Sequence, residues 1–178
     1  MVEAATGLPI ATLMDDRFLD PLELTHTRFI DDRSADVVPQ YLLAVDATGT
    51  TIVPHQFQRQ ILPVHRNDAA GGIQASATDL ARWGEALFRA RATSSDVVRA
   101  LLDIDAMRGL PCPNQCPHQY GLGAFHYTID GREFVGHDGS SGALLVHDID
   151  RATTIAIVAN GGEHDTDVLL RAIVAVFG

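Results

Sequence analysis

Apolar residues recur at helical spacing in the first two thirds of the chain. A stripe over residues 9–19 begins at a proline, which suits the first turn of a helix. A second helix is predicted from Ser76, with Asp79 at the spacing of a capping box. A third is predicted from Ser94 or Ser95, which can each cap a helix. This part of the chain is therefore expected to be mainly helical.

The last third has the pattern of β-strands. Asp130-Gly131 lies between two of the predicted strands and is typical of a tight hairpin turn. The predicted strands of the last third cover residues 120–129, 132–137, 143–147 and 153–159. Their order predicts an antiparallel meander of about four strands. Residues 31–70, earlier in the chain, show no clean period and are expected to form long loops with short strands.

A final helix is predicted from about Thr166 to Phe177. Its residues are almost all apolar, and Arg171 is the only interruption after Val168. A helix that is apolar on all sides must be covered on more than one side. One sheet face covers one stripe, so an exposed apolar surface is expected here unless something else packs on it. Helices first and strands later predict the α+β class, an antiparallel sheet with flanking helices.

Charge and composition exclude several classes of function. The chain has 178 residues, which is enough for one domain or part of one, and carries a net charge of −10. Such an acidic chain repels phosphate backbones, so no nucleic-acid partner is expected. No apolar run reaches the ~18 residues of a membrane span. All 13 basic residues are arginine. This excludes a lysine general base, Schiff base or Walker lysine from the chain.

Two cysteines lie close together, at Cys112 and Cys116, with His118 just beyond them. These three soft ligands would need a fourth ligand to hold zinc, and the sequence offers no second cluster. A disulfide within the loop and two unpaired thiols are the alternatives. No metal and no cofactor is predicted.

Four stretches of the chain follow one another in the order seen in a known family. They are residues 3–29, which include Thr6-Gly7 and Pro21-Leu22, residues 70–83, which begin Ala-Gly-Gly-Ile, residues 120–123, Tyr-Gly-Leu-Gly, and residues 136–160, which begin Gly-His-Asp-Gly. Together they resemble the C-terminal part of the serine β-lactamase-related family, which includes class C β-lactamases, D-alanyl-D-alanine carboxypeptidases and esterases.

The resemblance implies a partial serine β-lactamase/transpeptidase-like fold with the N-terminal half missing. Residues 1–178 would form the C-terminal portion of one such domain. Helices and loops would take up residues to about 118, and the strands and last helix about 119–178.

The resemblance also bears on the three catalytic motifs of the family. The Ser-x-x-Lys motif is absent because the chain has no lysine, and no tyrosine begins a Tyr-x-Asn motif. The third motif, often His-x-Gly in relatives, is matched by His137-Asp138-Gly139. Its implied role is to line the substrate edge of the sheet, with His137 inherited as the catalytic-motif residue and Gly139 and Ser140 as substrate-binding residues. No nucleophile is assigned within the chain.

A second interpretation would rebuild a triad from His137, Asp138 and Ser140 or Ser141. Neighbouring side chains of a strand point to opposite faces, so His137 and Asp138 are expected to diverge, which disfavours a triad. His137 could also be a strand-end histidine bonded to the backbone. Tyr120 is either a packing residue or part of the pocket wall.

Three functions remain open. The chain is a C-terminal fragment of a serine hydrolase that is inactive alone, or half of a split enzyme completed by another chain, or a non-catalytic peptide-binding module. The ligand would be a peptidoglycan-like peptide, a β-lactam or an ester. The expected partner is a complementary N-terminal half, or a second copy that associates through exposed apolar surface.

Overall fold

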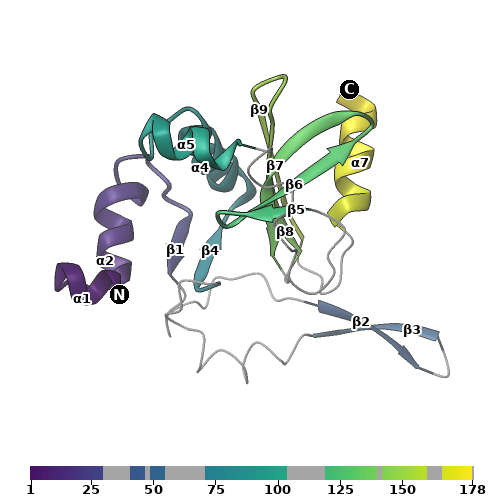
Figure 1. Ribbon diagram of the computed structural model, residues 1–178. Coiled ribbons are helices and arrows are strands. Elements are labelled where there is room, and N and C mark those ends of the chain that lie inside the picture. The colour runs from purple at the N-terminus through teal and green to yellow at the C-terminus, as the bar shows by residue number, and fades with distance from the viewer. Residues whose placement is uncertain are drawn as a thin grey trace.

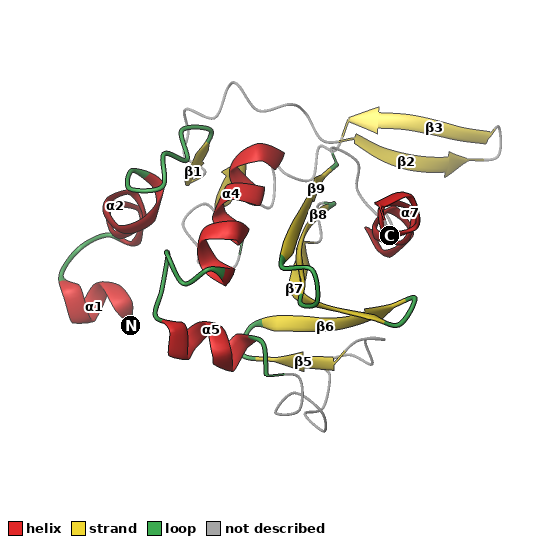
Figure 2. Ribbon diagram, turned by 90° about the horizontal axis from the view of Figure 1, so that it is seen from above, coloured by secondary structure: helices red, strands yellow, loops and turns green. Residues whose placement is uncertain are grey.

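The computed structural model describes residues 1–29, 41–46, 49–54, 71–103, 119–139, 142–159 and 166–177. The fold is α+β, as the order of patterns predicted. A five-stranded antiparallel sheet forms its centre, with helix α7 (Thr166–Phe177) on one face and helices α4 (Ala77–Phe88) and α5 (Ser95–Leu101) on the side of the other face (Figures 1 and 2).

The sheet is a meander in which each strand pairs with the next along the chain. Its strands are β5 (Gln119–Gly121), β6 (Ala124–Ile129), β7 (Arg132–Gly139), β8 (Ala143–Asp148) and β9 (Thr153–Val158). The meander was predicted, but the run over residues 120–129 is two strands and not one. Leu122 and Gly123 turn the chain there with φ of 50° and 79°. A leucine rarely adopts positive φ, so the sequence carried no clear signal for this turn.

The hairpin predicted at Asp130-Gly131 is present between β6 and β7. Both residues have positive φ, 52° and 79°, as a two-residue turn between twisted antiparallel strands requires. This turn fixes the register of β6 on β7, in which Phe125 lies opposite Gly136 and Tyr127 lies opposite Phe134.

The N-terminal segment differs from the single helix predicted over residues 9–19. A short helix α1 (Val2–Thr6) comes first and was not predicted, and α2 (Ile10–Met14) continues as a π-helical turn, η1 (Asp15–Leu19). Two small antiparallel pairs complete the fold: β1 (Thr27–Phe29) with β4 (Ile73–Ala75), and β2 (Tyr41–Asp46) with β3 (Gly49–Pro54).

The predicted N-terminus of α4 is confirmed, but Asp79 has another role than the capping box suggests. The Ser76 hydroxyl accepts the Asp79 amide at 3.1 Å. The Asp79 carboxylate, 1% exposed, accepts the amide of His26 at 2.7 Å and the hydroxyl of Thr27 at 3.1 Å. It therefore ties the segment that enters β1 to the start of α4. The cap of α5 is Ser94, whose hydroxyl accepts the Val97 amide at 3.4 Å.

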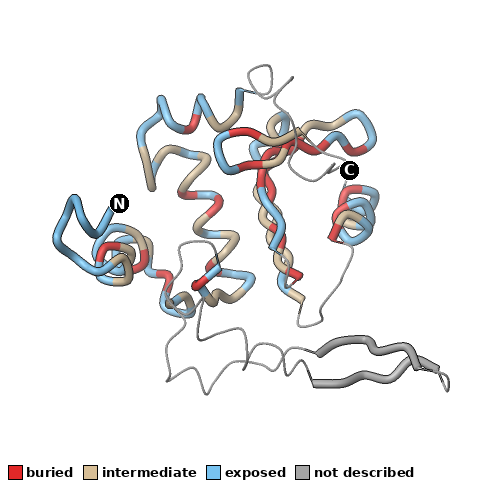
Figure 3. The backbone as a smooth tube through the Cα atoms, turned by 60° about the horizontal axis from the view of Figure 1, so that its bottom comes forward, coloured by how far each residue is buried: buried red, intermediate tan, exposed pale blue. Residues whose placement is uncertain are grey.

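The larger hydrophobic core lies between the sheet and α7. Figure 3 shows buried positions concentrated along the sheet and on one side of α7. The buried residues of this core are Tyr127, Ile129, Phe134, Leu144, Val146, Leu170 and Val174. A smaller cluster on the opposite face joins Ala124 and Val135 with Phe88 and Leu102, so Phe88 is a packing residue. Trp83 packs edge-on against Phe18, with 5.3 Å between ring centroids.

Helix α7 has the bounds predicted from the sequence and leaves much apolar surface uncovered. Val168 is 59% exposed, and Val176 and Phe177 are each 76% exposed. The sheet buries only the stripe that contains Leu170 and Val174. The exposed apolar surface expected on this helix is therefore present. Among the described helices, none is long and apolar enough to cross a membrane.

Candidate functional site at the open end of strand β7

The third-motif residues stand at the end of β7, where this strand pairs with only one of the other described strands. His137, Asp138 and Gly139 pair with Leu145, Leu144 and Ala143 of β8. Pairing with β6 stops one residue earlier, at Gly136. The side chains of His137 and Asp138 are 50% and 47% exposed. This open end of β7 is where an extended ligand has access to backbone groups of the sheet.

Aromatic side chains flank His137 on the side of β5 and β6. The imidazole lies 4.8 Å from the Phe125 ring and 5.7 Å from the Tyr120 ring, measured between centroids. Tyr120 and Phe125 also contact each other at 4.7 Å. Tyr120, whose role the sequence left open, is therefore both a packing residue and a neighbour of the third motif.

The predicted divergence of His137 and Asp138 is wrong. Nδ1 of His137 contacts the main-chain oxygen of Asp138 and lies 4.0 Å from its carboxylate Oδ1. Strand alternation sets the direction of each Cβ, but a half-exposed imidazole at a strand end can turn back along its own backbone. Ser140 and Ser141 lie outside the described residues, so the proposed serine of a local triad has no described position.

Tyr127 supports Asp138 from the core side and was not predicted as a site residue. Its hydroxyl lies 3.5 Å from Oδ1 of Asp138, and the side chain is buried. Burial, and then the charges of Asp138 and Asp167, raise the pKa of the Tyr127 hydroxyl far above its ordinary value. The hydroxyl therefore stays protonated and donates toward Asp138. The only sequence signal is alternation, which places residues 127 and 138 on the same face once the register is known.

Gly139 is the last described residue of the motif. It is exposed, and its carbonyl accepts the amide of Gly142, the residue before β8, at 3.1 Å. The predicted substrate-binding residue Ser140 lies outside the described residues. Cys112, Cys116 and His118 also lie outside the described residues, so the disulfide and zinc alternatives have no structural test. Within residues 1–29, 71–103, 119–139, 142–159 and 166–177, no three His, Cys, Asp or Glu side chains form a metal-binding group.

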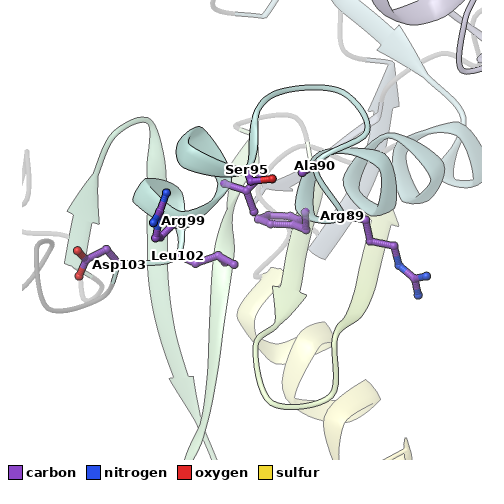
Figure 4. A pocket seen from close by; sticks show the side chains of 8 residues that line it. Arg89, Ala90, Ser95, Arg99, Leu102 and Asp103 are labelled. Atoms are coloured by element: carbon purple, nitrogen blue, oxygen red, sulfur yellow. The ribbon is translucent and has the colours of Figure 1, made fainter.

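An open pocket lies elsewhere, between the end of α4 and α5. Its volume is about 600 Å³. Figure 4 shows Arg89 and Asp103 at opposite sides of this pocket. None of the third-motif residues lines it. The lining residues are Phe88, Arg89, Ala90, Ser95, Val98, Arg99, Leu102 and Asp103.

Comparison with protein families identifies the family to which the chain belongs. Residues 1–176 match the family described as Beta-lactamase. The chain therefore belongs to the beta-lactamase family, as the four stretches and the third motif predicted. A search among curated proteins gives no match.

Solved structures share the fold at low sequence identity. The D-amino acid amidase from Ochrobactrum anthropi SV3, in complex with L-phenylalanine amide, has a TM-score of 0.75 and 18% identity over 99% of this chain and 55% of its own. The octameric penicillin-binding protein homologue from Pyrococcus abyssi gives 0.73 and 21%, over 99% and 39%. The penicillin-binding protein from Bacillus halodurans gives 0.67 and 16%, over 98% and 52%. The chain thus spans about half the length of the structures it matches.

Proposed function

We propose that these 178 residues are the C-terminal part of a serine hydrolase that transfers acyl groups from amides or esters. The observation that carries the proposal is the exposed His137-Asp138-Gly139 end of β7, paired on one side only, in a chain of the beta-lactamase family. The names of similar structures, an amidase, a penicillin-binding protein and a penicillin-binding protein homologue, support an acyl-amide substrate.

In this proposal, His137, Gly139 and Ser140 line the substrate edge. Gly139 leaves room for a ligand to approach the backbone, and the side of residues 137–139 that no described strand pairs with offers hydrogen-bonding groups. An acyl-transfer reaction needs an activated serine. Because the chain has no lysine, a Ser-x-x-Lys motif has to come from outside these residues. Loss of nucleophile and base costs about 10⁶-fold in serine hydrolases, so the chain alone is proposed to be inactive.

Residues 1–178 are proposed to be one portion of a single domain that a complementary N-terminal half completes. Two surfaces support this partner. The exposed apolar residues of α7, such as Val176 and Phe177, need a cover. Strand β9 carries no charged residue and, in the described part of the chain, pairs only with β8, so its outer edge can accept another strand.

The test uses the purified chain with nitrocefin, p-nitrophenyl acetate and a fluorophosphonate label. The chain alone is expected to give neither turnover nor labelled serine. Coexpression with a segment that carries Ser-x-x-Lys and Tyr-x-Asn is expected to restore both, with the label on that segment. A labelled serine in this chain alone would overturn the proposal. Val176→Asp, in the exposed apolar surface of α7, is expected to block complementation. Arg171→Ala, also on the exposed side of α7, is the control that shows whether any substitution in this helix has the same effect.

Self-association is the alternative use of the same apolar surface. Sedimentation of the chain at two concentrations distinguishes a second copy of the chain from a complementary N-terminal half as the partner. Self-association would be favoured by a dimer that dissociates in the Val176→Asp variant and persists when a complementary segment is added.

A second candidate is a non-catalytic module that binds extended peptides. The one-sided pairing of residues 137–139 favours it, since a peptide can add there as a strand. Saturable binding of a D-alanyl-D-alanine peptide to the isolated chain, without turnover after complementation, would support this candidate over the hydrolase.

A further inference from the structure

The contact between His137 and its neighbour constrains where the imidazole proton resides. Nδ1 of His137 meets the main-chain carbonyl oxygen of Asp138. A carbonyl oxygen can only accept a hydrogen bond, so Nδ1 has to be the donor. In a neutral imidazole, a hydrogen on one nitrogen leaves a lone pair on the other. Nε2, the distal nitrogen, is then an acceptor.

Two further groups favour the same arrangement. Oδ1 of Asp138 lies 4.0 Å from Nδ1, and its negative charge favours a hydrogen on that nitrogen over one on Nε2. The Tyr127 hydroxyl lies 3.5 Å from the same Oδ1 and is anchored in the core between the sheet and α7. Tyr127 therefore limits the positions that the half-exposed Asp138 carboxylate can take.

We propose that Tyr127 and Asp138 are positioning residues that hold neutral His137 as its Nδ1–H tautomer, which leaves Nε2 as a hydrogen-bond acceptor at the open end of β7. Asp138 is the middle residue of the third motif, so the motif supplies both the imidazole and the group that orients it. Tyr127 acts on His137 through its contact with Asp138.

The tautomer determines which ligands this end of β7 prefers. Nε2 with a lone pair and the Asp138 carboxylate both accept hydrogen bonds, so a ligand group that carries N–H or O–H is favoured. A ligand carboxylate meets two acceptors and a negative charge, and is disfavoured. The proposed ligand class is a neutral amide or alcohol beside the aromatic rings of Tyr120 and Phe125. This ligand preference rests on the proposed function, whereas the tautomer does not.

The tautomer can be measured in the chain as it is. The protein is labelled with ¹⁵N-histidine, and long-range proton–nitrogen correlation spectra are recorded at about pH 8.5, some two units above the ordinary histidine pKa. His137→Gln identifies the ring signals of His137 by their loss. Nδ1 is expected to show the nitrogen shift of a protonated ring nitrogen, and Nε2 that of an unprotonated one. The reverse pattern would overturn the proposal.

Two variants test the positioning roles. Asp138→Asn keeps the main-chain oxygen and the size of the side chain but removes the charge, and Tyr127→Phe removes only the hydroxyl. Both are expected to shift the Nδ1 signal toward the average of the two tautomers. Tyr120→Phe is the matched control, because it also removes a phenol beside His137 but one with no described bond to Asp138, and it should leave the signals in place. Unchanged signals in both Asp138→Asn and Tyr127→Phe would show that neither residue positions His137.

The ligand preference has its own measurement. Phenylacetamide and phenylacetate share an aromatic ring and differ in the group that would meet Nε2. Phenylacetamide is expected to shift the His137 and Asp138 signals at lower concentration than phenylacetate does. Equal shifts, a stronger effect of phenylacetate, or no effect of either would overturn the ligand preference. The serine-labelling test of the proposed function is independent of both spectra, so the two proposals fail separately.

Discussion

Strand β7 has two ends with different construction. At its start, Arg132 forms an ion pair with Asp148, which is fully buried, and the guanidinium lies over the Phe134 ring at 5.3 Å. At its far end, His137 and Asp138 are half exposed and, among the described strands, pair only with β8. At the paired end the two opposite charges, of Arg132 and Asp148, are paired with each other within the fold. The open end leaves hydrogen-bonding groups and an imidazole accessible, which is what a ligand requires.

The largest expected effect comes from breaking the ion pair at the paired end. Oδ1 of Asp148 accepts the amides of Asp150 and Arg151, each at 3.1 Å, and Oδ2 faces Arg132. Asp148→Ala leaves a mostly buried guanidinium without its partner. Removing one member of a buried pair costs about 3–5 kcal/mol, and urea unfolding should show a loss of this size. The exposed neighbour Asp150→Ala is the control and should stay within ~0.5 kcal/mol.

A smaller loss of stability is expected from a substitution at Gly136, the last residue of β7 that pairs with both β6 and β8. A Cβ at this position would fall on the Leu145 carbonyl oxygen and near the Val146 Cα, and backbone atoms cannot move aside as side chains do. Gly136→Ala should cost about 1–3 kcal/mol in urea unfolding, as overpacking does.

Gly84 of α4 provides the comparison for Gly136. A Cβ there would meet the Thr154 Cγ2 at 2.6 Å and the Leu145 Cδ1 at 2.7 Å, which are side-chain atoms. These atoms can shift, and alanine gains up to ~1 kcal/mol of helix propensity over glycine. Gly84→Ala is therefore expected to cost less than Gly136→Ala. The reverse order would mean that β7 and β8 separate more easily than α4 and the sheet.

The paired end should also make stability depend on pH through His147. This histidine, on β8, lies opposite Val135 of β7. Its ring stacks on that of Phe88 with 4.4 Å between centroids, and its Nδ1 lies 3.1 Å from the Thr154 hydroxyl oxygen in a hydrogen bond. Burial lowers its pKa, against a raising effect of Asp148 and with a further lowering by Arg89. The unfolded chain therefore takes up the proton first. Stability is complete above the unfolded pKa of about 6.5 and falls as pH drops through that value toward the folded pKa.

The slope attributable to His147 is at most ~1.4 kcal/mol per pH unit, because one proton is involved. Urea unfolding between about pH 8 and pH 5 measures it, and His147→Gln should flatten the curve in that range. A curve of the same shape in His147→Gln would assign the pH dependence to other groups.

Much of the fold follows from local rules that the sequence displays. The Ser76 cap, the Asp130-Gly131 turn and the length of α7 each depend on residues close together in the chain, and each is present as predicted. The turn at Leu122 was missed because a leucine with positive φ contradicts its local preference, and tertiary pairing of β5 with β6 decides the outcome.

The site was only partly predictable for a similar reason. Resemblance located His137 and Gly139, and the structure places both at an exposed strand end. The contact of Tyr127 with Asp138 depends on the register of β6 and on a side chain that reaches along the sheet. Neither can be predicted from the residues close to Tyr127 in the sequence. The position of the His137 ring depends on a rotamer, which strand alternation does not determine.

The smallest expected effect completes the comparison of the two ends. His137→Gln removes a half-exposed ring whose described contacts are with Tyr120, Phe125 and its own neighbour Asp138, and it leaves no buried charge unpaired. The free energy of unfolding should change by no more than ~0.5 kcal/mol, against the several kcal/mol of Asp148→Ala. The same variant is expected to lower fluorophosphonate labelling or turnover in the complemented enzyme. A loss of stability above ~1 kcal/mol would mean that the open end is part of what holds the sheet together. The contrast between the two ends of β7 would then be one of exposure only, and not of role.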